Sequence, residues 1–127
     1  MKGVFVVLAV ASLCACGGSG GSTTGPKNQG VNTPPPAGGI EVSNNAFSPV
    51  TKTVAVGTMV SWAWNSCTGD AYNGQTCVSH SVTFDDGTAS SPLQDQGTFN
   101  KTFNTAGTFT YHCSQHGAAM SGTITVQ

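Results

Sequence analysis

The sequence predicts an all-β fold of the sandwich type for residues 40–127. Apolar residues in this part alternate with polar ones in several short runs, as expected for strands that bury one face. Gly, Pro, Asn and Asp separate the runs, as is typical of turns between short strands. No segment carries the apolar repeat of an amphipathic helix. A two-layer β-sandwich is therefore the architecture that fits.

Residues 1–15 are interpreted as a lipoprotein signal peptide. Lys2 precedes an apolar stretch, residues 3–13, that is too short to span a bilayer as a permanent helix. The sequence Leu-Cys-Ala-Cys at positions 13–16 resembles the bacterial lipobox, in which cleavage before the last cysteine exposes it for lipid attachment. We therefore expect Cys16 to be lipidated and to anchor the protein to a membrane of the bacterial cell envelope, facing the periplasm or the exterior. A plain secretory signal with an unused thiol is the alternative.

Residues 16–39 are rich in Gly, Ser and Pro and contain one large apolar side chain, that of Val31. Such a segment cannot bury enough apolar surface to offset the entropy lost on ordering it. We interpret it as a lipidated flexible linker that gives the folded domain reach, or as an inert spacer. The remaining residues, 40–127, are enough for one domain with a closed core.

The expected strands follow one another through this domain, each marked by apolar residues on one face. In order, they contain Ile40 and Val42; Val54 and Val56; Val60, Trp62 and Trp64; Val82 and Phe84; Phe99 and Phe103; Phe109, Tyr111 and Cys113; and Ile124 and Val126. The segment 65–79 lacks this pattern and is expected to be a polar loop.

Charge is sparse and slightly negative in the domain. Two lysines stand against five carboxylates in residues 40–127, a net charge of −3, and there is no basic patch to neutralise phosphates. The composition therefore argues against binding to nucleic acid. Asp85 and Asp86, which precede a glycine, are interpreted as turn residues or as an acidic docking point for a basic partner.

Cys67 and Cys77 are expected to form a disulfide. They lie in the polar segment of a protein that carries an export signal, and cysteines pair in oxidising compartments. A metal site formed by Cys77 and His80 is the rival interpretation.

The segment 108–120, T-F-T-Y-H-C-S-Q-H-G-A-A-M, places Cys113, His116 and Met120 within eight residues. A thiolate, an imidazole and a thioether favour copper, and two His, one Cys and a distant Met describe a trigonal electron-transfer copper site. The second histidine has to come from elsewhere. In a strand reading, His112 points away from Cys113, which leaves His80 as the candidate.

The segments H-S-V-T-F-D-D (80–86) and G-T-F-T-Y-H-C-S-Q-H-G-A-A-M-S-G-T-I-T-V (107–126) resemble the copper-ligand segments of the cupredoxins, the type 1 blue copper proteins, most closely the plastocyanin type. Residues 40–62 resemble the opening strands of that family. The resemblance implies a Greek-key β-sandwich with one type 1 copper site, whose metal ligands are His80, Cys113, His116 and Met120. It also implies an electron-transfer protein and not an enzyme.

The same resemblance implies the partners and the supporting residues. Partners are redox proteins such as cytochromes or copper oxidases, and we expect the chain to be a monomer. Ser81 is expected to hold the ligand loop by a hydrogen bond, and residues 117–119 to form an apolar apron through which His116 meets partners. A copper carrier or resistance protein and a binding module with a vestigial site are the alternative functions. His112 is interpreted as a surface residue or an electron stepping point.

Overall fold

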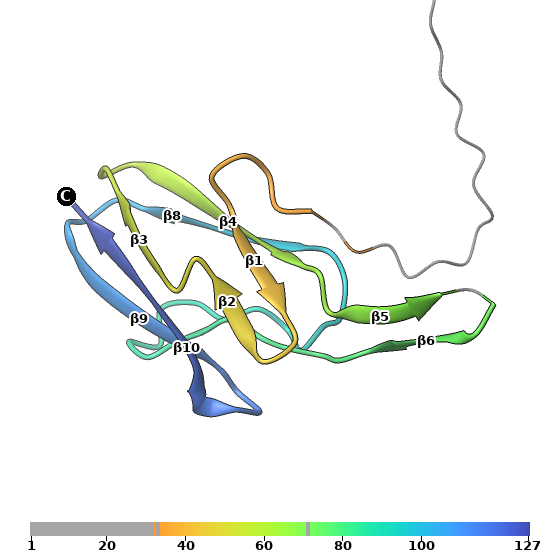
Figure 1. Ribbon diagram of the computed structural model, residues 1–127. Coiled ribbons are helices and arrows are strands. Elements are labelled where there is room, and N and C mark those ends of the chain that lie inside the picture. Colours follow the sequence, from red (N-terminus) through yellow and green to blue (C-terminus); the bar gives the residue numbers. More distant parts are fainter. Residues whose placement is uncertain (1–31, 33, 71) are drawn as a thin grey trace, which may run out of the picture.

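The computed structural model describes residues 32, 34–70 and 72–127 of the chain. The predicted signal peptide and Cys16 lie outside the described residues. The described part forms strands in two four-stranded sheets and one two-stranded sheet, which confirms the predicted all-β sandwich (Figure 1). A search of the same part for a helix of membrane-spanning length and hydropathy finds none.

The first sheet contains the strand that carries both tryptophans. Its strands are β2 (Ala46–Ser48), β1 (Ile40–Ser43), β4 (Thr58–Trp64) and β8 (Thr98–Phe103), in that order. β1 runs parallel to β4, with Val42 beside Trp64, whereas β8 runs antiparallel to β4. Both tryptophans of β4 are fully buried, as the alternation predicted.

The second sheet carries the segment that contains the predicted ligands Cys113, His116 and Met120. Its strands are β3 (Thr51–Val54), β10 (Gly117–Val126), β9 (Gly107–Cys113) and β7 (Thr83–Phe84), in that order. β9 and β10 form an antiparallel hairpin whose turn contains His116. The register of the hairpin breaks between Gly117 and Ser121, so Met120 lies within a bulge at the start of β10.

Aromatic rings fill the space between the two sheets. The Trp62 ring lies 5.4 Å from that of Tyr111 and 5.8 Å from that of Phe84, both nearly perpendicular to it. Phe47 packs edge-on against Tyr111 at 4.8 Å. Burial raises the pKa of Tyr111 to about 12, so this residue stays neutral in the core. A Cβ atom at Gly122 would lie 2.4 Å from the Tyr111 ring, so only glycine leaves room for the ring there.

Three parts of the fold differ from the sequence prediction. Val56 lies outside β3 and is 49% exposed. β2 was not predicted, because it contains one inward apolar residue, Phe47. The segment 65–79 is not a loop, since β5 (Cys67–Asp70) and β6 (Gly74–Cys77) form a hairpin that projects from the sandwich (Figure 1).

Asn32, which falls in the predicted linker, contacts the base of that hairpin. Its side-chain amide donates to the carbonyl of Cys67 and accepts the N–H of Cys67, both at 3.1 Å. The chain ahead of β1 is therefore in contact with the domain at this residue.

Candidate metal centre

His80 lies between β6 and β7 and is fully buried. Its main chain forms an isolated antiparallel bridge with Gln94: the N–H of His80 donates at 2.8 Å and its carbonyl accepts at 3.0 Å. The indole N–H of Trp64 donates to the same carbonyl at 3.0 Å. A short polar segment is thus held against the core, with its imidazole directed inward.

Cys113 ends β9 and His116 follows in the turn. The N–H of His116 donates to the Cys113 carbonyl at 3.1 Å, and Gly117 adopts a positive φ of 53° at the start of β10. Cys113 is fully buried, and within the described chain it is the cysteine that has no disulfide partner. The turn therefore returns an imidazole to the sulfur three residues before it.

The three side chains meet although the sequence separates His80 from Cys113 by 33 positions. The Nδ1 atoms of His80 and His116 lie 3.8 Å and 3.4 Å from Sγ of Cys113, and the ring centroids are 5.1 Å apart. One donor atom from each residue lies within 4.8 Å of the other two. Two imidazole nitrogens and a thiolate are donors suited to copper, so this cluster fits the metal.

Met120 is the fourth residue of the predicted set. It is 1% exposed and belongs to the same hydrophobic core as Cys113, because it lies on the face of β10 that also carries Ile124 and Val126. Met120 lies in the strand β10 and not in the turn that holds His116. Met59 is 61% exposed on β4 and is not a competing thioether.

The electrostatics of the cluster favour metal binding. Burial lowers the pKa of His80, and the neighbouring His116 lowers it further by charge repulsion. His80 is therefore neutral at neutral pH, with a nitrogen lone pair available to a cation. In the described part of the chain, no hydrogen-bond partner faces Nε2 of His80, which is also buried.

Ser81 joins the two ligand segments, as the resemblance implied. Its N–H donates to Sγ of Cys113 at 3.5 Å. Its hydroxyl donates to the Ser114 hydroxyl and accepts the Ser114 N–H, both at 2.9 Å. The strand that carries Cys113 is thereby fastened to the segment that carries His80.

His112 lies on the opposite face from Cys113, as predicted. Its Nδ1 lies 2.5 Å from a carboxylate oxygen of Asp85, at the rim of a surface groove of about 350 Å³. Hydrogen bonds from Thr110 and then from His112 lower the pKa of Asp85. Asp86 accepts bonds from Thr88 within a turn. Asp85 therefore has a partner that the sequence analysis did not identify.

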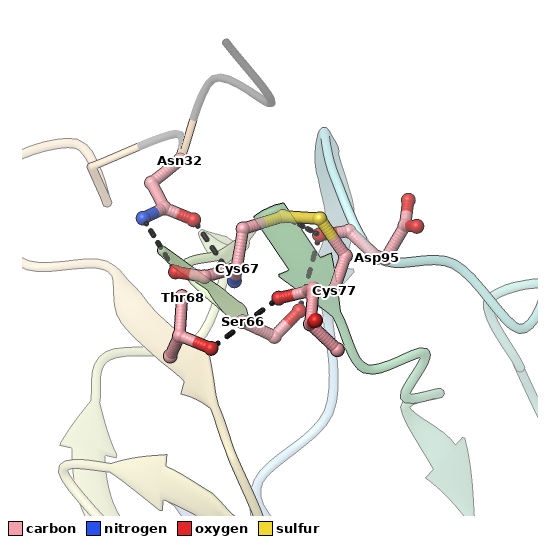
Figure 2. The surroundings of a disulfide bond; sticks show 7 residues. Asn32, Ser66, Cys67, Thr68, Cys77 and Asp95 are labelled. Atoms are coloured by element: carbon pink, nitrogen blue, oxygen red, sulfur yellow. Dashed lines mark hydrogen bonds between the residues drawn. A yellow bond between two sulfur atoms is a disulfide. The ribbon is translucent and has the colours of Figure 1, made fainter. Parts of the chain in front are cut away.

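Cys67 and Cys77 form a disulfide in the structure, directly opposite each other at the base of the β5–β6 hairpin (Figure 2). The rival site of Cys77 and His80 does not form, because Cys77 is taken by the disulfide. Sequence reasoning expected the pairing but missed the strands that it joins.

Comparison with known proteins gives the family. Residues 38–127 match the copper binding proteins of the plastocyanin/azurin family. No curated protein sequence matches the chain.

Solved structures share the fold. The chain is 25% identical to oxidised plastocyanin from Dryopteris crassirhizoma, with a TM-score of 0.54, covering 69% of this chain and 98% of that one. A purple cupredoxin from Nitrosopumilus maritimus is 24% identical with a TM-score of 0.55, covering 69% and 97%. A variant of amicyanin is 22% identical with a TM-score of 0.56, covering 69% and 79%. The chain therefore belongs to the plastocyanin/azurin family of copper-binding proteins, has the cupredoxin fold, and takes copper as its cofactor.

Proposed function

We propose that this protein is a type 1 copper electron-transfer protein that shuttles single electrons between extracytoplasmic redox partners. The observation that carries the proposal is the convergence of His80, Cys113 and His116 within 4.8 Å in a buried cluster. The proposed metal ligands are these three residues and Met120, which is buried in the same hydrophobic core as Cys113. Copper held there supplies a one-electron couple.

The chain contributes rigidity to this function. The ligand residues come from β9, the turn after it, β10 and the segment before β7, and Ser81 ties this last segment to the end of β9. Side chains fixed in this way move little when the charge of a bound metal changes, which favours fast transfer. No acid, base or nucleophile is needed, so we propose that the protein is not an enzyme.

The route to partners is proposed to pass through His116. His116 is half-buried, and Ala118 and Ala119 beside it are exposed. This apolar apron would let a redox protein, such as a cytochrome or a copper oxidase, approach the cluster closely. We propose that the protein acts as a monomer in the bacterial cell envelope, anchored by lipid at Cys16; the lipobox-like sequence at positions 13–16 supports the anchor.

Voltammetry of the copper-loaded protein, combined with exposure to a mild chelator, tests the proposal. An electron-transfer protein is expected to give a reversible one-electron wave and to keep its copper. A copper carrier with the same ligands would lose the metal rapidly to the chelator. A vestigial site would take up no copper, which would refute the proposal.

A further inference from the structure

Among the described residues, the buried His80 lacks the hydrogen bond that commonly orients a metal-binding imidazole. Such a histidine usually donates its second ring N–H to a carbonyl, carboxylate or water. The Nδ1 atom of His80 faces Cys113, while its Nε2 atom has no hydrogen-bond partner among the residues described. The orientation of this ring therefore depends on packing and on the main chain of His80.

Two short segments hold that main chain. The first leads from β6 to His80, and the N–H of Val78 in it donates to the Ser66 carbonyl at 3.1 Å. The second contains Gln94, which pairs with His80, and Asp95, whose carbonyl accepts the Ser66 hydroxyl at 3.1 Å. Both segments are therefore hydrogen-bonded to Ser66.

Ser66 is the neighbour of the disulfide. Figure 2 shows Ser66, Asp95 and the Cys67–Cys77 bridge gathered at the base of the hairpin, with Sγ of Cys67 4.0 Å from the Asp95 carbonyl. On the other side of the bridge, the side-chain amide of Asn32 forms two hydrogen bonds with the main chain of Cys67. The bridge thus lies at the junction from which both segments run to His80.

The β5–β6 hairpin itself adds little to the core. Its residues beyond the bridge are mostly exposed, and Tyr72 at its tip is 95% exposed. A two-stranded hairpin is marginally stable in water. The covalent bond between opposite residues is therefore what fixes the two strands, and with them the position of Ser66 relative to Val78.

We propose that the Cys67–Cys77 disulfide is a positioning element for the copper ligand His80. It acts through Ser66, which holds both the segment that leads into His80 and the segment that pairs with His80, and so helps to orient a ring whose Nε2 has no partner among the described residues. The inference rests on the proposed function for the role of His80 as a ligand.

The double variant Cys67→Ser/Cys77→Ser tests this proposal. In the metal-free protein, the N–H groups of His80 and Gln94, each of which donates to the carbonyl of the other residue, are expected to exchange their hydrogens faster than in the wild type. The amide of Thr123, which donates to Val50 on the far side of the sandwich, is expected to keep its rate. Copper dissociation is expected to accelerate, and copper affinity to fall by roughly 10- to 100-fold, as is usual when an outer contact to a metal ligand is lost.

Two further variants make the result decisive. Tyr72→Ser changes the tip of the same hairpin and is expected to alter neither the exchange nor the copper dissociation. Ser66→Ala removes the hydrogen bond to Asp95 but leaves the disulfide intact. It is expected to accelerate both the hydrogen exchange and the copper dissociation, by less than the double variant does. Should the double variant fail to fold, Ser66→Ala decides the question.

Unchanged exchange at His80 and Gln94 in a folded double variant, or in Ser66→Ala, would overturn the proposal. A wild-type protein that binds no copper would instead refute the proposed function. The hydrogen-exchange comparison would still report on the disulfide in that case, because it uses the metal-free protein. The two failures are therefore distinguishable.

Discussion

The main-chain N–H of Ser81 donates to Sγ of Cys113 at 3.5 Å, across 32 positions of sequence. Hydrogen bonds to the cysteine sulfur are one of the features that tune the potential of a blue copper site. The same residue bonds twice to Ser114 through its hydroxyl. Ser81 is therefore both a neighbour of the sulfur and the link between the two segments that hold the donors.

Removing that hydroxyl in Ser81→Ala is expected to leave the Ser114 N–H without its partner. Loss of the bond should destabilise the metal-free protein by about 1 kcal/mol and speed the loss of copper. Urea unfolding and copper dissociation measure the two effects. Thr83→Val removes another neighbour of the hydroxyl but keeps the bonds to Ser114, so it serves as the control. A Ser81→Ala protein with wild-type stability and copper retention would count against the link.

The two tryptophans of β4 form a matched pair. Both are fully buried, but Trp64 donates to the His80 carbonyl, whereas Trp62 packs against Tyr111 and Phe84. Trp64→Phe and Trp62→Phe remove a similar ring volume, so both should lower stability. Only Trp64→Phe is expected to accelerate copper dissociation as well, because it alone removes a hydrogen bond to the main chain of a ligand residue. Equal dissociation rates in the two variants would show that the indole bond does not position His80.

A charge placed beside His116 is expected to slow electron exchange. In Ala118→Glu, two copies that meet through the apron would bring like charges together and desolvate them. The electron self-exchange rate, measured from NMR line broadening, should fall roughly tenfold or more at low salt. Thr105→Glu adds the same charge to an exposed position at the other end of β9 and should have a much smaller effect. An unchanged electron self-exchange rate in Ala118→Glu would show that partners do not approach through residues 117–119.

Gly122→Ala tests the packing next to the ligand strand. The added methyl group would meet the Tyr111 ring at 2.4 Å, and a fully buried ring between Trp62 and Phe47 has no free space to move into. The variant should therefore be destabilised by about 1 to 3 kcal/mol in denaturant unfolding. The exposed neighbour gives a control, since Ser121→Ala should be nearly neutral. An unfolding midpoint for Gly122→Ala equal to that of the wild type would show that the Tyr111 ring can move aside.

Alternation predicted the strands that line the core, because a strand with one buried face must repeat its apolar residues at every second position. The pattern of Val60, Trp62 and Trp64 is an example. Alternation could not predict the β5–β6 hairpin, since strands without a buried face leave no apolar pattern. It also missed the start of β10, where glycine and alanine residues and a bulge hide Met120.

The residues of the candidate site could be predicted from the sequence more completely than the details of the fold. Cys113, His116 and Met120 are near neighbours along the chain, and elimination of His112 left one histidine to complete the set. The structure brings His80 to Cys113 and buries both. The contacts that hold His80, from Gln94, Trp64 and the disulfide region, depend on distant main-chain atoms and left no signal in the sequence.

The central claim is that Cys113 is a copper ligand in a type 1 site, and a titration with Cu(II) tests it most directly. The wild-type protein is expected to bind one equivalent and to develop an intense visible absorption band, as its family implies. Cys113→Ser, which keeps the size of the side chain but loses the thiolate, is expected to develop no such band. The same band at the same intensity in Cys113→Ser would contradict the account.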